Sequence, residues 1–353
     1  MDTKIPWTKD RARWLALASI HGIHDKILHT LWKKFGKRGS LAFDYYYRQL
    51  RLFEKPIATN PFFLAEKLDS LNIHFILWED ESYPHVLKHI TDPPLTLFVR
   101  GNQNLNPAFP IAVVGTRHAS VYGIRVAKKI TTDLAYAGAT IISGLAIGID
   151  AIAQQSALQA GGKCIAVLGT GIDDASIYPR IHISLAKQIL SSGGSIISEY
   201  PPGTQGLKYH FPKRNRIIAG LSQATLVIEA SEKSGSLITA ELANDYSREV
   251  FAVPGPITDA RSIGTNKLIS RGAGICNSAL DILKHCVEDS YISLTPTLTS
   301  EEKEILLHAQ EPIHIDTLAR ILKKPGNEIS ARICRMEFEG KIQAYPGDFY
   351  IAN

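Results

Sequence analysis

Between residues 111 and 285, short uninterrupted apolar runs alternate with longer segments in which apolar residues recur every three or four positions. The short runs have the length of strands buried on both faces, and the longer segments have the periodicity of helices. This alternation predicts an α/β fold, a Rossmann-like, doubly wound and mostly parallel sheet with helices on both faces. The predicted strands are 111–114, 140–142, 164–168, 195–197, 225–228, 250–253 and 274–276, and the predicted helices are 121–137, 149–160, 181–191, 215–221, 237–246 and 266–271.

Smaller segments flank this region on both sides. In residues 10–70 apolar residues recur at helical spacing, with a break at residues 21–24 between two short helices. Residues 83–110 hold five prolines and one predicted strand at 95–99. After residue 296 the pattern predicts three helices and a hairpin, which together are typical of a winged helix. These helices are 300–308, 315–322 and 327–339, and the hairpin strands are 342–345 and 349–351.

We therefore predict three domains in the 353 residues, in agreement with the usual size of domains. Residues 1–82 are expected to form a helical domain of the SAM or helix–hairpin–helix kind. Residues 83–290 are expected to form the Rossmann-like domain, which includes the proline-rich entry segment. Residues 297–353 are expected to form the winged-helix-like domain.

Composition narrows the class of protein. Hydrophobic residues make up 45% and charged residues 21%, as in ordinary globular proteins, which excludes a wholly disordered or fibrous chain. No apolar stretch is long enough to span a bilayer, and the first residues lack the apolar core of a secretory signal, so we expect no membrane association. The four cysteines form no CxxC pair and have no zinc-ligand spacing. We therefore expect reduced thiols, no metal site and a cytoplasmic protein.

Charge is distributed unevenly along the chain. Residues 1–52 carry eleven Lys or Arg against four Asp, a net charge of +7, whereas residues 297–353 carry −2. A basic N-terminal segment indicates a polyanion partner, although a solvated surface explains the same charges equally well. Because a reader of duplex DNA is normally basic, the acidic C-terminal segment favours a protein-contacting or regulatory role there.

Glycines and small polar residues follow several of the predicted strands. In an open α/β sheet, ligands bind at the carboxyl ends of the strands, where glycine lets a ligand approach the backbone and helix-start amides attract anions. We therefore expect a strip of phosphate sites along this edge of the sheet. The candidate residues are Gly115, Thr116, Arg117, Ser143, Gly144, Gly148, Ser234, Gly235 and Ser236.

Two common nucleotide-binding motifs are missing from these loops. The sequence contains no GxxxxGK[ST], which leaves a P-loop NTPase unsupported. The loop Gly169-Thr170-Gly171 is followed by Asp174 where a dinucleotide fingerprint requires its third glycine. The phosphate-binding edge is therefore not explained by either of these nucleotide folds.

Residues 208–216 (KYHFPKRNR) combine four basic and two aromatic residues without an acid. Such a segment suits a single strand of nucleic acid, because cations follow the phosphates and rings stack on the bases. In the structural alternative, Phe211 belongs to the core and Pro212 begins a helix. In addition, we expect some of the cations to pair with Asp150, Glu199 or Glu229. The candidate contacts are Phe211, Lys213, Arg214, Asn215 and Arg216.

These loops and this basic segment resemble the DprA/Smf family of bacterial DNA-processing proteins. The resemblance covers nearly the whole chain, is strongest in seven blocks that occur in order, and is weaker in the flanking domains. The blocks are Gly115-Thr116-Arg117, SGLAIGIDAIA at 143–153, AVLGTG at 166–171, ISEYPPGT at 197–204, FPKRNRIIAGLS at 211–222, SGSLITA at 234–240 and EVFAVPG at 249–255.

The resemblance implies a function in DNA handling that is not enzymatic and needs no cofactor. Family members bind single-stranded DNA cooperatively as dimers, protect incoming strands and load the RecA recombinase on them, chiefly in natural transformation. The resemblance implies that Arg117 holds a phosphate beside Thr116, that Lys213 and Arg216 line the same pocket, and that Phe211 contacts a base. It also implies a homodimer surface within residues 265–275, with Lys267, Leu268 and Ile275 as candidates.

Two other functions stay open at this point. Rossmann-like nucleotide phosphoribohydrolases use a glycine-rich loop and a carboxylate, which Ser234-Gly235-Ser236 with Glu229 or Glu241 could supply, although their PGGxGTxxE pattern is absent. In the second alternative, residues 297–353 read duplex DNA and the protein is a regulator.

Overall fold

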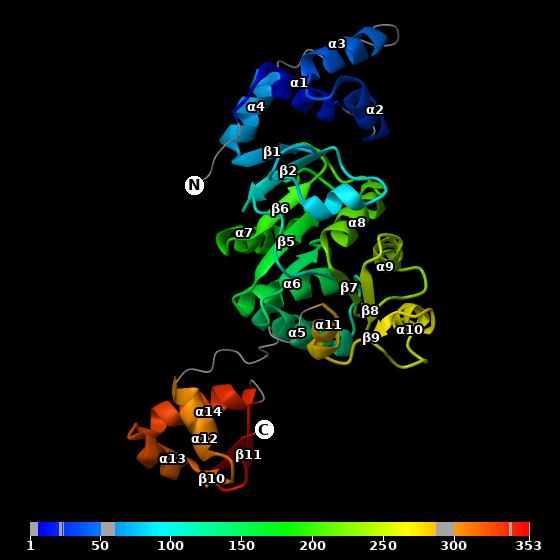
Figure 1. Cartoon of the computed structure of the whole chain (residues 1–353). Coiled ribbons are helices and arrows are strands. Elements are labelled where there is room, and N and C mark those ends of the chain that lie inside the picture. The colour runs from blue at the N-terminus through cyan, green and yellow to red at the C-terminus, as the bar shows by residue number, and fades with distance from the viewer. Residues whose placement is uncertain are drawn as a thin grey trace. The chain divides into compact units, whose positions relative to one another are not determined.

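The structure is a computed structural model that describes residues 6–20, 23, 25–50, 61–286, 300–338 and 341–352. Contacts divide the chain into two units, Met1–Ile292 and Ser293–Asn353 (Figure 1). The first unit contains both the predicted helical segment and the sheet, so their separation into two domains stays a prediction. The predicted domain ends at residues 290 and 297 lie outside the described residues, and of the predicted break at 21–24 the structure describes Ile23 alone.

A nine-stranded sheet forms the centre of the first unit (Figure 1). Its strands are β1 (Ile73–Leu77), β2 (Thr96–Gly101), β3 (Pro110–Val114), β4 (Thr140–Ser143), β5 (Lys163–Leu168), β6 (Ser195–Ser198), β7 (Ala224–Val227), β8 (Glu249–Ala252) and β9 (Gly274–Ile275). Their order is β1-β2-β6-β5-β4-β3-β7-β8-β9, and the seven strands from β6 to β9 run parallel. Each strand predicted between residues 111 and 285 is present within one residue of its expected bounds. The predicted α/β, mostly parallel fold is therefore confirmed.

Helices cover the sheet on both faces (Figure 1). Because both faces are covered, alternate residues of a strand are buried in different layers, which explains why the strands are apolar throughout. On one side, Ala112, Val114 and Val167 of the sheet form a buried cluster with Ile217 and Ile218 of α8. One layer contains α5 (Val121–Tyr136), α6 (Ile149–Gln159), α7 (Ile183–Ser191) and α11 (Ala279–Cys286), the other contains η1 (His85–His89), α8 (His210–Leu221) and α9 (Gly235–Asp245), and α10 (Ile263–Ser270) packs on β8.

The edge of the sheet at β1 and β2 was only half predicted. Strand β2 overlaps the predicted strand at 95–99, but β1 was missed, and β1 pairs antiparallel with β2, which pairs antiparallel with β6. On α1, the Arg11 side chain forms an ion pair of 2.9 Å with Asp80 and donates a hydrogen bond to the carbonyl oxygen of Phe75, which ties the N-terminal helices to this edge. These helices are α1 (Lys9–Ala18), α2 (Asp25–Phe35), α3 (Gly39–Leu50) and α4 (Pro61–Ser70).

The second unit contains the three predicted helices and both strands of the predicted hairpin. A further strand, β10, was missed because two residues are too few to show a pattern. The elements are α12 (Ser300–His308), β10 (Ile313–His314), α13 (Ile315–Leu322), α14 (Gly326–Phe338), β11 (Ile342–Tyr345) and β12 (Phe349–Ala352), with the sheet order β10-β12-β11. Their core is Ile305, Ala309, Leu318, Ile329, Ile333, Met336 and Ile342.

Within the described part of the chain, every helix is too short or too polar to cross a membrane. The described residues also contain no group of three or more His, Cys, Asp or Glu that could hold a metal ion. Cys164, Cys276 and Cys286 are free thiols, and the first two are buried.

Candidate nucleic-acid interface

Helix α8 begins at His210, five residues before its predicted start at residue 215. Residues 210–216 of the basic segment therefore lie on a helix, with Pro212 in the first turn, where proline is tolerated. Residues three apart on a helix share a face. Phe211 and Arg214 consequently lie on one side of α8, whereas Lys213 and Arg216 lie on another.

Arg117, which follows β3, lies against Phe211 at the start of α8. The guanidinium carbon of Arg117 is 6.0 Å from the centroid of the Phe211 ring, and the Tyr178 ring centroid is 5.8 Å from that of Phe211. Arg117 and Tyr178 are exposed, whereas Phe211 is half-buried. The surface thus presents a cation beside two rings. Tyr178 was not among the predicted residues, although an aromatic side chain in the loop after the predicted strand 164–168 was the available signal.

Arg214 lies in the interior instead of on the binding surface where it was expected. It is 4% exposed and donates hydrogen bonds to the carbonyl oxygens of Gly144, at 2.9 Å, and of Val167. Burial lowers the pKa of Arg214 to about 10, and the charge of Asp150 opposes that shift. Burial also raises the pKa of the Asp150 carboxyl, against the effect of Arg214. Arg214 therefore links the carboxyl ends of β4 and β5 through hydrogen bonds in the interior.

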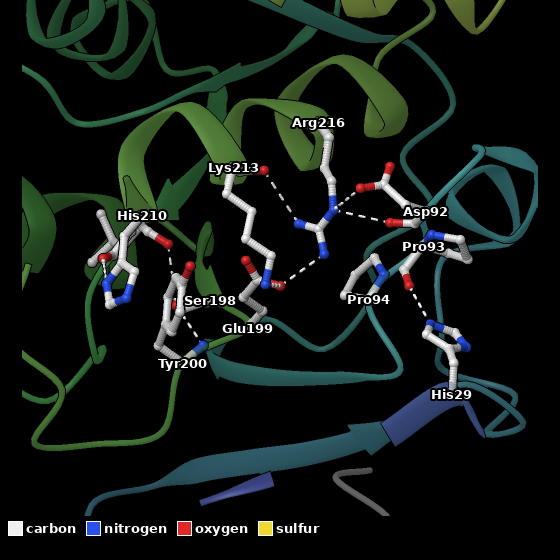
Figure 2. A network of polar contacts seen from close by, with 12 residues as sticks. His29, Asp92, Pro93, Pro94, Ser198, Glu199, Tyr200, His210, Lys213 and Arg216 are labelled. Atoms are coloured by element: carbon white, nitrogen blue, oxygen red, sulfur yellow. Dashed lines mark hydrogen bonds and ion pairs between the residues drawn. The ribbon is translucent and has the colours of Figure 1, made fainter. Parts of the chain in front are cut away.

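Lys213 and Arg216 share one carboxylate, that of Glu199 after β6 (Figure 2). Oε2 of Glu199 lies 2.7 Å from Nη2 of Arg216 and 3.3 Å from Nζ of Lys213. Nε of Arg216 also lies 3.1 Å from Oδ2 of Asp92. The Arg216 side chain is 3% exposed, so it is buried and neutralised, whereas that of Lys213 is 34% exposed. The expectation that part of the basic segment pairs with Glu199 is confirmed, and Arg216 has a structural place.

The start of α5 is already occupied by a carboxylate of the protein. The strand order reverses between β3 and β7, the place where doubly wound sheets usually bind ligands. There Oε2 of Glu229 accepts a hydrogen bond of 2.9 Å from the backbone N–H of Ser120, and Oε1 accepts one from its hydroxyl. The carbonyl oxygen of Glu229 also accepts from the N–H of Thr116 at 2.7 Å. The Glu229 carboxylate thus occupies the place at the start of α5 where a bound phosphate would otherwise lie. The half-buried Gly115 and Thr116 therefore form no open phosphate site at α5, and they connect β3 to Arg117.

The remaining predicted loop residues mainly hold the loops in place. The hydroxyl of Ser143 donates to the carbonyl oxygen of Val113 at 2.7 Å, and the N–H of Gly144 donates to Oδ2 of Asp150 at 3.0 Å. Ser234 caps α9 by accepting from the N–H of Ser236, which is buried. The amide of Asn215 donates to the carbonyl oxygen of Gly235 at 3.2 Å, which joins α8 to the exposed first residue of α9.

The predicted dimer residues lie on α10 and on the edge strand β9. Lys267 is exposed and Ile275 is 50% exposed. Leu268 is partly buried against the core cluster that includes Val227. Exposed apolar side chains at a sheet edge are available for pairing with a second surface.

A family model described as "DNA recombination-mediator protein A" matches residues 74–287. Curated relatives agree with it. Protein Smf from Escherichia coli is 39% identical over 294 residues, which cover 80% of this chain and 78% of the relative. DNA processing protein DprA from Bacillus subtilis is 42% identical over 217 residues, which cover 61% of this chain and 72% of the relative.

Two solved structures are similar to this chain. The X-ray structure of DNA processing protein A from Streptococcus pneumoniae matches with a TM-score of 0.62 and 34% identity, over 79% of this chain and 98% of that chain. A structure of DNA processing protein A from Helicobacter pylori, which concerns its single-stranded DNA binding mode, matches with a TM-score of 0.53 and 30% identity. That match covers 60% of this chain and 94% of the other.

Proposed function

This chain belongs to the DprA/Smf family of DNA recombination mediators, and we propose that it binds single-stranded DNA on the surface formed by Arg117, Phe211 and Lys213. The observation that carries the proposal is the position of the exposed Arg117 guanidinium over the half-buried Phe211 ring, 6.0 Å from its centroid. A cation beside an accessible ring offers one group for a phosphate and another for a base. The Helicobacter pylori relative, whose structure concerns single-stranded DNA binding, supports the same ligand.

The two cations of this surface lie on different sides of the first turn of α8, so in this proposal the strand passes over that turn. Phe211 faces Arg117, and two residues later Lys213 lies near Tyr200, with 5.7 Å between Nζ and the ring centroid. Arg214 and Arg216 are buried beneath the surface, so in this proposal they position Phe211 and Lys213 and do not contact phosphates. Binding through few cations and rings is tolerant of sequence, because every base has a face that can stack.

The finer parts of the proposal follow from membership of the family. The protein protects incoming strands and loads RecA on them, chiefly in natural transformation, and it acts in the cytoplasm as a homodimer through the surface around Lys267, Leu268 and Ile275. It does so without catalysis, and the place of Glu229, whose carboxylate accepts hydrogen bonds from the backbone N–H and the hydroxyl of Ser120, supports this. Loading is tested by measuring whether the protein speeds RecA assembly on a strand already covered by single-strand-binding protein.

The second unit has the element order of a winged helix, with α12, β10, α13, α14, β11 and β12 in sequence. This order supports the winged-helix assignment. Its net charge of −2 over residues 297–353 supports a contact with protein in preference to duplex DNA.

Charge reversal tests the proposed surface. We expect Arg117→Glu and Lys213→Glu to weaken binding of single strands of any sequence and to flatten the salt dependence, because each phosphate contact contributes about −0.7 to the log–log slope. Lys163→Glu is the matched control, since Lys163 is exposed at the amino end of β5, whereas Arg117 and Phe211 lie at the carboxyl ends of the strands. Fluorescence anisotropy with a single strand and a duplex at two salt concentrations gives the answer. Binding that is unchanged in both variants would remove the proposal.

A further inference from the structure

A groove of about 570 Å³ lies between the N-terminal helices and the segment that leads into α8. Its volume is within the range of small-molecule sites, which is about 300–1,000 Å³. One wall is contributed by α1, the segment after it, α2 and α4, and the other by residues 199–213. Lys67 and Lys213 are the lysines of the lining, and Glu199 is its acid.

The wall formed by the N-terminal helices is mainly apolar. Leu15 and Leu68 are buried, whereas Ile20, Ile23 and Leu64 are half-buried and leave part of their side chains accessible in the groove. A flat ring that moves from water onto this apolar wall is stabilised, because burial of apolar surface contributes roughly 25 cal/mol of favourable free energy per Å².

The opposite wall contains three aromatic side chains, those of Tyr200, Tyr209 and His210. The rings of Tyr200 and His210 are stacked, with centroids 4.0 Å apart and planes at 22° (Figure 2). Tyr209 meets His210 edge to face, with centroids 4.7 Å apart, and is 62% exposed. The exposed Tyr209 and the half-buried Tyr200 are the rings of this wall that a further aromatic group can contact, whereas His210 is buried behind them.

Each wall also carries a cation. Lys213 projects from α8 beside Tyr200, and the exposed Lys67 projects from α4. The acid in the lining, Glu199, is already paired with Arg216 and Lys213. An apolar wall, an aromatic wall and two cations together suit a ligand that joins a flat ring to a phosphate.

We propose that this groove takes an unstacked nucleobase of the bound single strand, with the adjoining phosphates near Lys67 and Lys213. The inference rests on the proposed function, because the strand enters the groove past Lys213. It adds a contact from α1, α2 and α4, which precede residues 74–287 matched by the family model. The N-terminal helices thereby form one side of the DNA site.

A substitution that fills the groove tests this with the full-length protein. We expect Leu64→Trp to weaken binding of a strand of thymidines by about fivefold to 150-fold, which is the loss of one stacked base at about 1–3 kcal/mol. Binding of an abasic strand with the same phosphates should stay at the wild-type level, because no cation is lost. Leu41→Trp is the matched control, since Leu41 is 49% exposed on α3 and does not line the groove.

Tyr209→Ala tests the other wall, with Tyr136→Ala on α5 as its control, since Tyr136 is 40% exposed. If Leu64→Trp lowers the thermal unfolding midpoint, its weaker binding could come from damage to the N-terminal helices. Tyr209→Ala leaves those helices unchanged, so this variant then tests whether the groove binds a base. We expect Tyr209→Ala to reduce the fluorescence change of a strand that carries 2-aminopurine and to leave abasic binding unchanged.

Equal weakening of both strands, or no weakening of either, would overturn the groove as a base site. Failure of the proposed function has a different signature, because there Arg117→Glu and Lys213→Glu leave both strands bound as tightly as the wild type. A loss in Leu64→Trp that is confined to the strand with bases, together with weaker binding by Lys213→Glu, supports the groove.

Discussion

The ammonium of Lys213 lies 3.3 Å from Oε2 of Glu199, so this cation of the proposed surface is paired before any strand arrives. The same oxygen lies 2.7 Å from the buried Arg216 guanidinium. One carboxylate therefore neutralises an interior arginine and also holds a half-exposed lysine in position. A phosphate that approaches Lys213 competes with an interaction that the fold supplies.

Removing the charge of Glu199 should mainly cost stability. Glu199→Gln leaves the buried Arg216 with Asp92 as its described acid partner, and loss of one partner from a buried pair costs about 3–5 kcal/mol. Urea unfolding should show a lower free energy of unfolding by this order. The control Glu232→Gln, at an exposed position, should change it by no more than about 0.5 kcal/mol. A Glu199→Gln variant as stable as this control would show that the shared carboxylate is dispensable.

Gly148 should prove necessary for the position of Arg117. Its φ of +87° disfavours other residues, and an added Cβ would lie 2.3 Å from the carbonyl oxygen of Thr116 and 2.8 Å from backbone atoms of Arg117. Gly148→Ala should therefore lower stability by about 1–3 kcal/mol and also weaken strand binding. Gly161→Ala is the matched control, because its φ is +76° and no atom lies within 4 Å of the added Cβ.

Unfolding and anisotropy measurements on both glycine variants separate the effect of backbone strain from the effect of moving the Arg117 backbone. Gly161→Ala should lose about 1–2 kcal/mol of stability from its backbone conformation alone and bind strands as the wild type does. If the two variants bind strands equally well, the contact of Gly148 with the Arg117 backbone has no role in binding.

Phe211 should contribute to binding through its ring and not through charge. Phe211→Ala should weaken strand binding by about 1–3 kcal/mol while the slope of affinity against salt stays the same, because no phosphate contact is lost. Phe63→Ala, at a 60% exposed position on α4, is the control. A change in slope for Phe211→Ala in anisotropy titrations would instead indicate that the substitution moves Arg117.

The buried thiols of Cys164 and Cys276 and the half-buried thiol of Cys286 should resist reaction at neutral and mildly alkaline pH. Burial raises the pKa of Cys164 and of Cys276 to about 12 and that of Cys286 to about 11. The thiolate is the reactive form, so a Cys334→Ser variant should react slowly with a disulfide reagent when native and quickly when unfolded. Rapid modification of the native variant would contradict the buried positions.

The same shifts predict the direction of alkaline stability. Each pKa is raised in the folded state, so the unfolded chain loses its thiol protons first, from about pH 8.5 upward. The contribution of these thiols to stability is therefore complete below that pH and is lost as the pH rises through about 11 to 12. Urea midpoints measured from neutral to alkaline pH should fall less steeply in Cys164→Ala than in the wild type.

Local pattern was enough for the sheet and for its helices. Strand β3 is a run of five buried residues, and α5 repeats its apolar side chains at helical spacing, so a few neighbouring residues carried the information for each. The start of α8 was not predicted, because its cationic sequence around Phe211 and Pro212 lacks apolar periodicity and is typical of a loop. Strand β1 was missed because its five residues follow a helical segment after only two residues and pair with residues of β2 that lie 19 to 27 positions later.

The order of apolar and polar residues was sufficient to predict the parallel sheet, the edge at which polar loops gather and the residue types available for a strand of DNA. Which cations face solvent depends on the folded arrangement, because Arg216 is neutralised by Glu199 and Asp92 from distant segments, whereas Arg117 stays exposed beside Phe211. It also decided that Glu229 fills the start of α5, since Ser120 lies 109 residues away along the chain. Periodicity reports on neighbours within a few residues, but the burial and pairing of a charge depend on what the fold brings to it from elsewhere.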